Sequence, residues 1–216
     1  MESLFDPSLF ISTDYNSIKF SYKDIVQDIL ALKSSTTDYD LTGQIIWPAA
    51  EFLSKFIIDN PNYFQGKTVL ELGAGAGLSG MIASQFAKKV ILTDGNDIVI
   101  DLLEKNLKFC GKQNVDVKKL TWGFENTKVF LEDVGEINQV IGADILFWPD
   151  SIKDLVLSLK CLKEKCVLED IWLCICNRSK YSEDLFDSTL AAEELEREII
   201  AQEKEIYLYK IISKKN

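Results

Sequence analysis

The stretch Val69-Leu-Glu-Leu-Gly-Ala-Gly-Ala-Gly-Leu-Ser-Gly80 decides how this chain folds. Residues 67–72 form a compact apolar run, broken by one acid at Glu71, and this run predicts a buried strand. From residue 78 to residue 87 apolar side chains recur at helical spacing, which predicts a helix. Such a tight strand-to-helix turn lets a ligand lie against bare backbone at a helix N-terminus. The glycines of this turn are Gly73, Gly75 and Gly77.

The glycine spacing fits a dinucleotide poorly. In the pattern G-x-G-x-x-G the third glycine would fall at Leu78. Glu71, two residues before the first glycine, would repel a pyrophosphate and would suit a cationic ligand with an amine or a sulfonium. We therefore expect the loop to disfavour NAD. A glycine-rich turn that binds no ligand is the alternative.

Composition bounds the class of protein. The chain has 216 residues and 47% hydrophobic residues, which suits one globular domain. We expect no membrane span, since no apolar run reaches the ~20 residues required, and no signal peptide, since the first residues lack a basic region. Five scattered cysteines without any histidine predict reduced thiols of the cytosol or nucleus and no metal site.

The net charge and the absence of histidine exclude or disfavour several classes of function. The formal net charge is −10. Proteins that bind nucleic acid usually present a basic face, so nucleic acid is disfavoured as a partner. An acidic chain favours basic partners, such as a protein surface that carries lysines. The absence of histidine excludes Ser-His and Cys-His catalysis.

Strands and helices alternate along the remaining chain. This order predicts one doubly wound α/β domain over residues 41–216, preceded by an N-terminal extension over residues 1–40. Strands are predicted at residues 17–22, 67–72, 90–93, 115–120, 140–147 and 170–176. Helices are predicted at residues 24–32, 48–59, 78–87, 96–111, 151–162 and 182–192. The ligand of such a domain lies at the C-terminal ends of the strands.

Several polar or aromatic residues stand at those strand ends. Asp94 follows the second buried strand, about 20 residues beyond the glycine loop, where a carboxylate can bind ribose hydroxyls. Asn96 can cap the next helix. Trp122 ends the third strand and could pack on an adenine ring. Asp144 interrupts an apolar run, which costs energy unless the carboxylate is paired or functional. Ser151 with Asp154 is typical of a capping box.

Five motifs lie at Thr42–Ala50, Glu71–Gly77, Leu92–Asn96, Leu120–Gly123 and Gly142–Phe147. Together they resemble one family. The chain resembles the seven-β-strand protein-lysine methyltransferases of family 16, the group that includes calmodulin-lysine and elongation-factor lysine methyltransferases. E-L-G-A-G-x-G is shared with all class I methyltransferases that use S-adenosylmethionine (SAM), and L-T-W-G replaces the family's L-D-W-G, with Thr121 in place of the acid. The motif N/D-P-P-Y/F, typical of enzymes that methylate bases or glutamine, is absent.

The resemblance implies a fold, a cofactor and a site. The fold is a Rossmann-like seven-strand class I SAM-dependent methyltransferase fold in a single three-layer domain, with residues 194–203 and 206–212 as an antiparallel pair. The cofactor is SAM. Asp144 and Phe147 would face the target amine as catalytic residues. The SAM pocket would be formed by Trp47, Glu71, Gly73, Ala74, Gly75, Asp94, Asn96, Trp122 and Ala143.

The resemblance also implies a reaction. We expect N-methylation of an exposed lysine on a non-histone cytosolic protein, such as a translation elongation factor or a chaperone. We expect a monomer in the cytoplasm, with the nucleus as a second location. Two other functions stay open at this point. One is methylation of a small molecule or RNA on the same scaffold, and the other is a catalytically silent SAM-binding protein.

Overall fold

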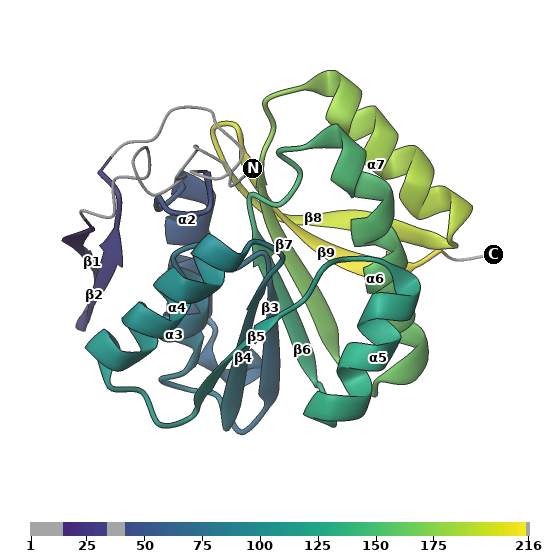
Figure 1. Cartoon of the computed structure of the whole chain (residues 1–216). Coiled ribbons are helices and arrows are strands. Elements are labelled where there is room, and N and C mark those ends of the chain that lie inside the picture. The colour runs from purple at the N-terminus through teal and green to yellow at the C-terminus, as the bar shows by residue number, and fades with distance from the viewer. Residues whose placement is uncertain (1–14, 34–41, 215–216) are drawn as a thin grey trace, which may run out of the picture.

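A seven-stranded sheet forms the centre of the computed structural model, which describes residues 15–33 and 42–214 (Figure 1). Its strand order is β5-β4-β3-β6-β7-β9-β8. The first five strands in this order run parallel, and β9 is antiparallel to both of its neighbours. The strands are β3 (Thr68–Leu72), β4 (Lys89–Asp94), β5 (Val115–Lys119), β6 (Gln139–Ala143), β7 (Asp170–Cys176), β8 (Leu195–Glu203) and β9 (Ile206–Ser213). The predicted seven-stranded α/β fold is confirmed.

Among the described residues, six α-helices cover the two faces of the sheet, as the arrangement in Figure 1 illustrates. The core between α2, α3, α4 and one face includes Leu53, Met81 and Leu103, and the core between α5, α6, α7 and the other face includes Phe130, Leu159 and Phe186. The helices are α2 (Pro48–Asp59), α3 (Leu78–Ala83), α4 (Asp97–Cys110), α5 (Phe124–Val134), α6 (Ile152–Lys165) and α7 (Lys180–Ala192), with short 3-10 turns η2 (Pro61–Tyr63) and η3 (Pro149–Ser151). None of the described helices is long and apolar enough to cross a membrane.

The strand order places a crevice at the middle of the sheet. From β3 the chain adds β4 and then β5 on one side, after which it returns to place β6 on the other side of β3. In open α/β sheets the ligand lies where the direction of winding reverses, at the C-terminal ends of the strands. This point falls beside the glycine turn after β3.

The C-terminal pair of strands forms as expected. Strands β8 and β9 pair antiparallel from Leu195↔Ser213 to Glu203↔Ile206, with a bulge between Ile199 and Ala201. Strand β9 in turn pairs with β7. Residues 195–203 therefore form a strand, as the resemblance implied.

Residues 24–32 do not form a helix, and that prediction is wrong. Strand β1 (Asn16–Tyr22) and strand β2 (Ile25–Ala31) make an antiparallel hairpin. β-branched side chains such as Ile25 and Val26 fit a strand better than a helix, and their helical spacing is overridden by pairing with β1. The rest of the predicted extension, residues 1–14 and 34–40, lies outside the described residues.

Asn106 of α4 joins the hairpin to the glycine turn. Its fully buried amide accepts a hydrogen bond from Leu30 N at 2.7 Å and donates to Leu30 O and Ala76 O, both at 2.9 Å. These three hydrogen bonds use both N–H groups of the amide and one acceptor position of its oxygen, and all three partners are main-chain groups. The hairpin is thereby held against the glycine turn, which lines the candidate site.

Several predicted boundaries need correction. Helix α3 ends at Ala83 rather than residue 87, β6 ends at Ala143 rather than residue 147, and α7 begins at Lys180 rather than residue 182. Helix α5 was not predicted at all. The capping box is also wrong, because the Ser151 hydroxyl donates to Trp148 O at 2.8 Å and makes no cap to α6.

Candidate cofactor and substrate site

A cavity of about 490 Å³ opens at the C-terminal ends of the central strands. It is lined by the turns after β3, β4, β5 and β6 and by the segment that leads into α2. All the predicted site residues except Glu71 line this cavity. They are Trp47, Gly73, Ala74, Gly75, Asp94, Asn96, Trp122, Ala143, Asp144 and Phe147.

The glycine turn leaves its backbone bare toward the cavity. Gly73 and Gly75 have φ angles of +58° and +54°, in the left-handed region that favours glycine. A Cβ on Gly75 would lie 3.0 Å from Gly43 O, and one on Gly73 would lie 3.2 Å from a ring carbon of Trp122. A side chain at either position would therefore be both strained and crowded.

Asp94 lies where the second strand meets this turn. Its Oδ2 accepts from Gly75 N at 3.3 Å, and its Oδ1 accepts from Asn96 N at 3.0 Å. Burial raises the pKa of Asp94, and the backbone hydrogen bonds oppose that rise. Asn96 both lines the cavity and caps α4, since its Oδ1 accepts from Ile98 N at 2.9 Å. Both predicted features of Asn96 are thus present together.

Glu71 lies beneath the turn and does not line the cavity. Its side chain is buried, and Oε2 accepts from Gly80 N at 2.9 Å. Burial raises the pKa of Glu71 to about 8, against the lowering effect of its hydrogen bonds from Gly80 and Ser79. The carboxyl group therefore links β3 to the first turn of α3 by a buried hydrogen bond.

Asp144 is the most constrained residue of the site. It follows β6 with a φ angle of +59°, which is unusual for a residue with a side chain, and its side chain is only 3% exposed. Backbone conformations of this kind tend to occur at functional sites. Its Oδ1 also accepts from Cys176 N at 3.3 Å.

Arg178, which was not predicted as a site residue, pairs with Asp144. Its Nη1 donates to Asp144 Oδ1 at 2.6 Å and its Nη2 donates to Asp144 Oδ2 at 2.5 Å. The pair brings the loop after β7 against the end of β6. A signal was present: Arg178 follows the predicted strand at residues 170–176, which is the next strand along the chain after the one that contains the unexplained acid Asp144.

Two aromatic rings stand beside this ion pair. The ring centroids of Trp47 and Phe147 are 5.6 Å apart, and the guanidinium of Arg178 lies 4.8 Å from the first and 5.6 Å from the second. Trp47 is held by a hydrogen bond from Nε1 to Thr42 O at 2.8 Å. The end of the cavity next to Asp144 therefore consists of two aromatic side chains beside the ion pair of Asp144 with Arg178.

The chain matches the family described as lysine methyltransferase over residues 25–192. This chain belongs to that family. The match begins within β2 and extends to the end of α7, so it includes every element that lines the cavity. The resemblance inferred from the motifs is confirmed.

Curated relatives carry related names. Calmodulin-lysine N-methyltransferase of Arabidopsis thaliana is 29% identical over 187 residues, which cover 83% of this chain and 56% of the relative. Protein N-lysine methyltransferase METTL21A of Mus musculus is 30% identical, covering 77% and 75%. Histone-arginine methyltransferase METTL23 of Xenopus laevis is 31% identical, covering 60% and 56%. The chain spans about half the length of the first curated relatives that it matches.

Solved structures share the fold. A 16S rRNA N2 G1207 methyltransferase of Thermus thermophilus, in complex with AdoMet and guanosine, superposes with a TM-score of 0.62. The identity is 15%, and the match covers 93% of this chain and 51% of that one. At this identity the similarity shows the class I methyltransferase fold and nothing of the substrate.

Membership of a methyltransferase family makes SAM the cofactor, and the cavity fits it. The bare turn at Gly73–Gly75 can receive the amino acid end, and the Asp94 carboxylate can accept from ribose hydroxyls. Trp122 supplies a flat ring on the wall formed by the turn after β5. Among the described residues, no cluster of histidine, cysteine or acidic side chains could hold a metal ion.

Asp94→Ala should weaken SAM binding by about 1–3 kcal/mol, because it removes a hydrogen-bond acceptor from a partly buried polar site. Titration calorimetry measures this loss. Asp97→Ala is the matched control, since that acid lies three residues along in the first turn of α4, is 80% exposed and pairs with Lys119 outside the cavity. Equal SAM affinity in the wild-type protein and the Asp94 variant would remove Asp94 from the binding site.

Proposed function

We propose that this protein is a SAM-dependent protein-lysine N-methyltransferase. The observation that carries the proposal is a single cavity that joins two halves. One half has the features of a SAM site, and the other presents Asp144 together with the rings of Trp47 and Phe147. The family membership supports lysine as the target.

The second half of the cavity suits an amine. A lysine side chain has an unperturbed pKa of ~10.4 and must lose a proton before its nitrogen can attack a methyl group. Apolar walls at Trp47 and Phe147 disfavour the charged form by desolvation. Asp144 can accept a hydrogen bond from the amine and orient it. SAM, when bound, supplies an electrophilic methyl group on a sulfonium.

Placement can provide much of the rate. Asp144 and Phe147 follow β6 directly, and the glycine turn follows β3, which is its hydrogen-bonded neighbour in the sheet. Rigid elements therefore hold the amine side and the cofactor side in one fixed arrangement. Alignment of this kind can contribute many orders of magnitude without a strong general base.

The substrate is proposed to be a non-histone protein of the cytosol. The net charge of −10 favours a basic partner surface, on which an exposed lysine is common. Curated relatives act, by their names, on calmodulin and on histone arginine. Elongation factors and chaperones are the proposed substrate class here, with the protein acting as a monomer in the cytoplasm and also in the nucleus.

Arginine is the second candidate target, because one relative is named a histone-arginine methyltransferase. The family description and the remaining reported relatives favour lysine. A small-molecule or RNA substrate and a silent SAM-binding protein are further outcomes that an assay must separate.

Label transfer from SAM tests the proposal. Purified protein is incubated with methyl-labelled SAM and an extract of cells that lack the protein, so that its target site is unmethylated. We expect label in a discrete protein band that protease removes and ribonuclease does not. Label confined to RNA or to small molecules, or no transfer above a boiled-enzyme control, would reject the proposal.

A further inference from the structure

Arg178 carries an inference about how the amine site works. Its guanidinium binds both oxygens of Asp144, and arginine presents a planar fork that matches a carboxylate in this way. The carboxylate is 3% exposed and the arginine side chain is 35% exposed. The buried charge of Asp144 is therefore compensated from the solvent side of the site.

The pairing leaves Asp144 able to accept one more hydrogen bond. A carboxylate has about four acceptor positions. Within the described chain, Arg178 takes one on each oxygen and Cys176 N takes a second one on Oδ1. The remaining position is on Oδ2. Asp144 lines the cofactor cavity, and Arg178 lines a smaller hollow of about 210 Å³ that shares Phe147 with this cavity.

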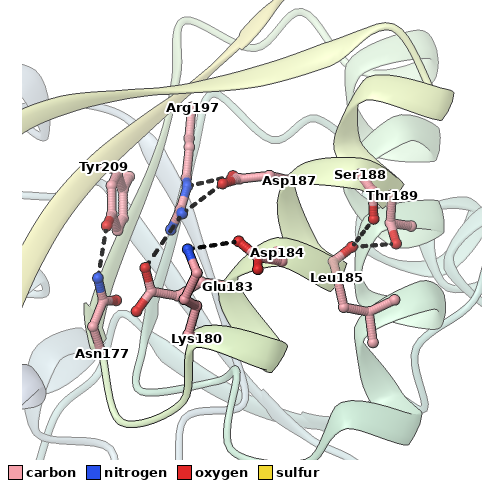
Figure 2. A network of polar contacts seen from close by, with 10 residues as sticks. All are labelled: Asn177, Lys180, Glu183, Asp184, Leu185, Asp187, Ser188, Thr189, Arg197 and Tyr209. Carbon is pink, nitrogen blue, oxygen red and sulfur yellow. Dashed lines mark hydrogen bonds and ion pairs between the residues drawn. The ribbon is translucent and has the colours of Figure 1, made fainter.

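The chain contains two arginines, and both make the same two kinds of contact. Its arginines are Arg178 and Arg197, among 24 basic residues. Figure 2 shows Arg197 paired with Asp187. The two contacts measure 2.6 and 2.9 Å, and the ring centroid of Tyr209 lies 4.4 Å from the guanidinium of Arg197. Each arginine thus pairs with a carboxylate and packs on an aromatic ring, but only Arg178 does so beside the cavity.

We propose that Arg178 is a positioning residue that cancels the charge of Asp144 and fixes its plane, so that the target amine meets an oriented acceptor without being held as an ammonium ion. This inference rests on the proposed function. The ammonium form has no lone pair for methyl transfer. An unpaired carboxylate within ~4–6 Å would favour that form and raise the pKa of the amine by about 1–3 units.

Other titratable groups face the pair. Burial raises the pKa of both neighbouring thiols of β7, Cys174 and Cys176, so these thiols stay neutral in the neutral pH range. The chain contains no histidine. The carboxylates nearby come from η3, α6, α7 and the turn between β8 and β9, and they are Asp150, Asp154, Glu183 and Glu205. None of the four is removed in the experiment below.

The experiment compares Arg178→Gln with Arg178→Lys across pH 6.5–9. The probe is the unmethylated protein band that the wild-type protein labels in extract, purified from cells that lack the methyltransferase. For Arg178→Gln we expect kcat at pH 7 to fall at least tenfold and to recover as the pH rises by about 1–3 units. Its KM should not rise, and SAM affinity should stay unchanged. Arg178→Lys keeps the charge and should keep the wild-type pH profile.

Arg197→Gln is the control for loss of an arginine–carboxylate pair. It should lower the melting temperature without moving the pH profile. Turnover of Arg178→Gln that falls equally at every pH would overturn the charge role. Turnover that rises would overturn it too, since it would show that Arg178 obstructs the amine. Absence of transfer by the wild-type protein would reject the proposed function itself and, with it, this inference.

Discussion

Asp144→Ala is expected to abolish most methyl transfer while leaving SAM binding nearly unchanged. The carboxylate lies at the end of the cavity that is proposed to receive the amine, on the opposite side of β3 from Asp94. A contact that orients the amine acts in the transition state, so its loss lowers kcat rather than cofactor affinity. Misplacement of a reacting group by about 1 Å can cost roughly 100-fold, and we expect a loss of at least this size.

Asp144→Asn is the sharper variant. It keeps the shape of the side chain but removes the charge that pairs with Arg178. If an oriented anion is required, Asn should impair kcat almost as much as Ala does. Initial rates and calorimetry with SAM measure the two effects separately. A variant that melts several degrees lower yet methylates at the normal rate would assign Asp144 a purely structural role, as the anchor of Arg178 and Cys176 N.

Glu71→Gln is expected to remove a strong pH dependence of stability. The pKa of Glu71 is raised to about 8 in the folded protein, from 4.5 for an exposed carboxyl group. Between these values the folded state holds a proton that the unfolded state has released, so the free energy of unfolding falls as pH rises. The slope approaches 1.4 kcal/mol per pH unit, or roughly 3–4 kcal/mol between pH 5 and pH 8.

The lack of histidine makes this measurement clear. Histidine is the only side chain whose unperturbed pKa lies in that window, and the chain contains no histidine. Urea unfolding of the wild-type protein and of Glu71→Gln at pH 5, 6, 7 and 8 gives the two curves without SAM. We expect them to diverge, with the variant relatively more stable at pH 8. Parallel curves would show that Glu71 is already ionised throughout the range.

The sequence predicted the parts of the site that follow from local pattern. A buried strand, a glycine turn and a helix occur at residues 68–83, and Asp94, Trp122 and Asp144 stand at strand ends that meet in one cavity. Parallel strands present their C-terminal ends at one edge of a sheet, so these positions could be brought together from strand order alone. The glycine spacing, which fits a dinucleotide poorly, could also be read from the sequence alone.

The failures lie where tertiary contacts override local pattern. The hairpin strand β2 has helical spacing, but it is held by β1 and by Asn106 from a helix 76 residues away in sequence. Glu71 was placed beside the cofactor, whereas it binds Gly80 N beneath the turn. Arg178 was missed because only the pairing of β6 with β7 brings it to Asp144. Contacts across strands depend on register, which periodicity does not specify.

The residue that receives the methyl group tests the central claim most directly. The protein band labelled by the wild-type enzyme is digested and its peptides are fragmented in a mass spectrometer, with Asp144→Ala as the matched inactive enzyme. Our account predicts methyl groups on the Nζ of a defined lysine, present after treatment with the wild-type protein and absent with the variant. Methyl groups on arginine or on any other residue type, or lysine methylation that persists with Asp144→Ala, would contradict it.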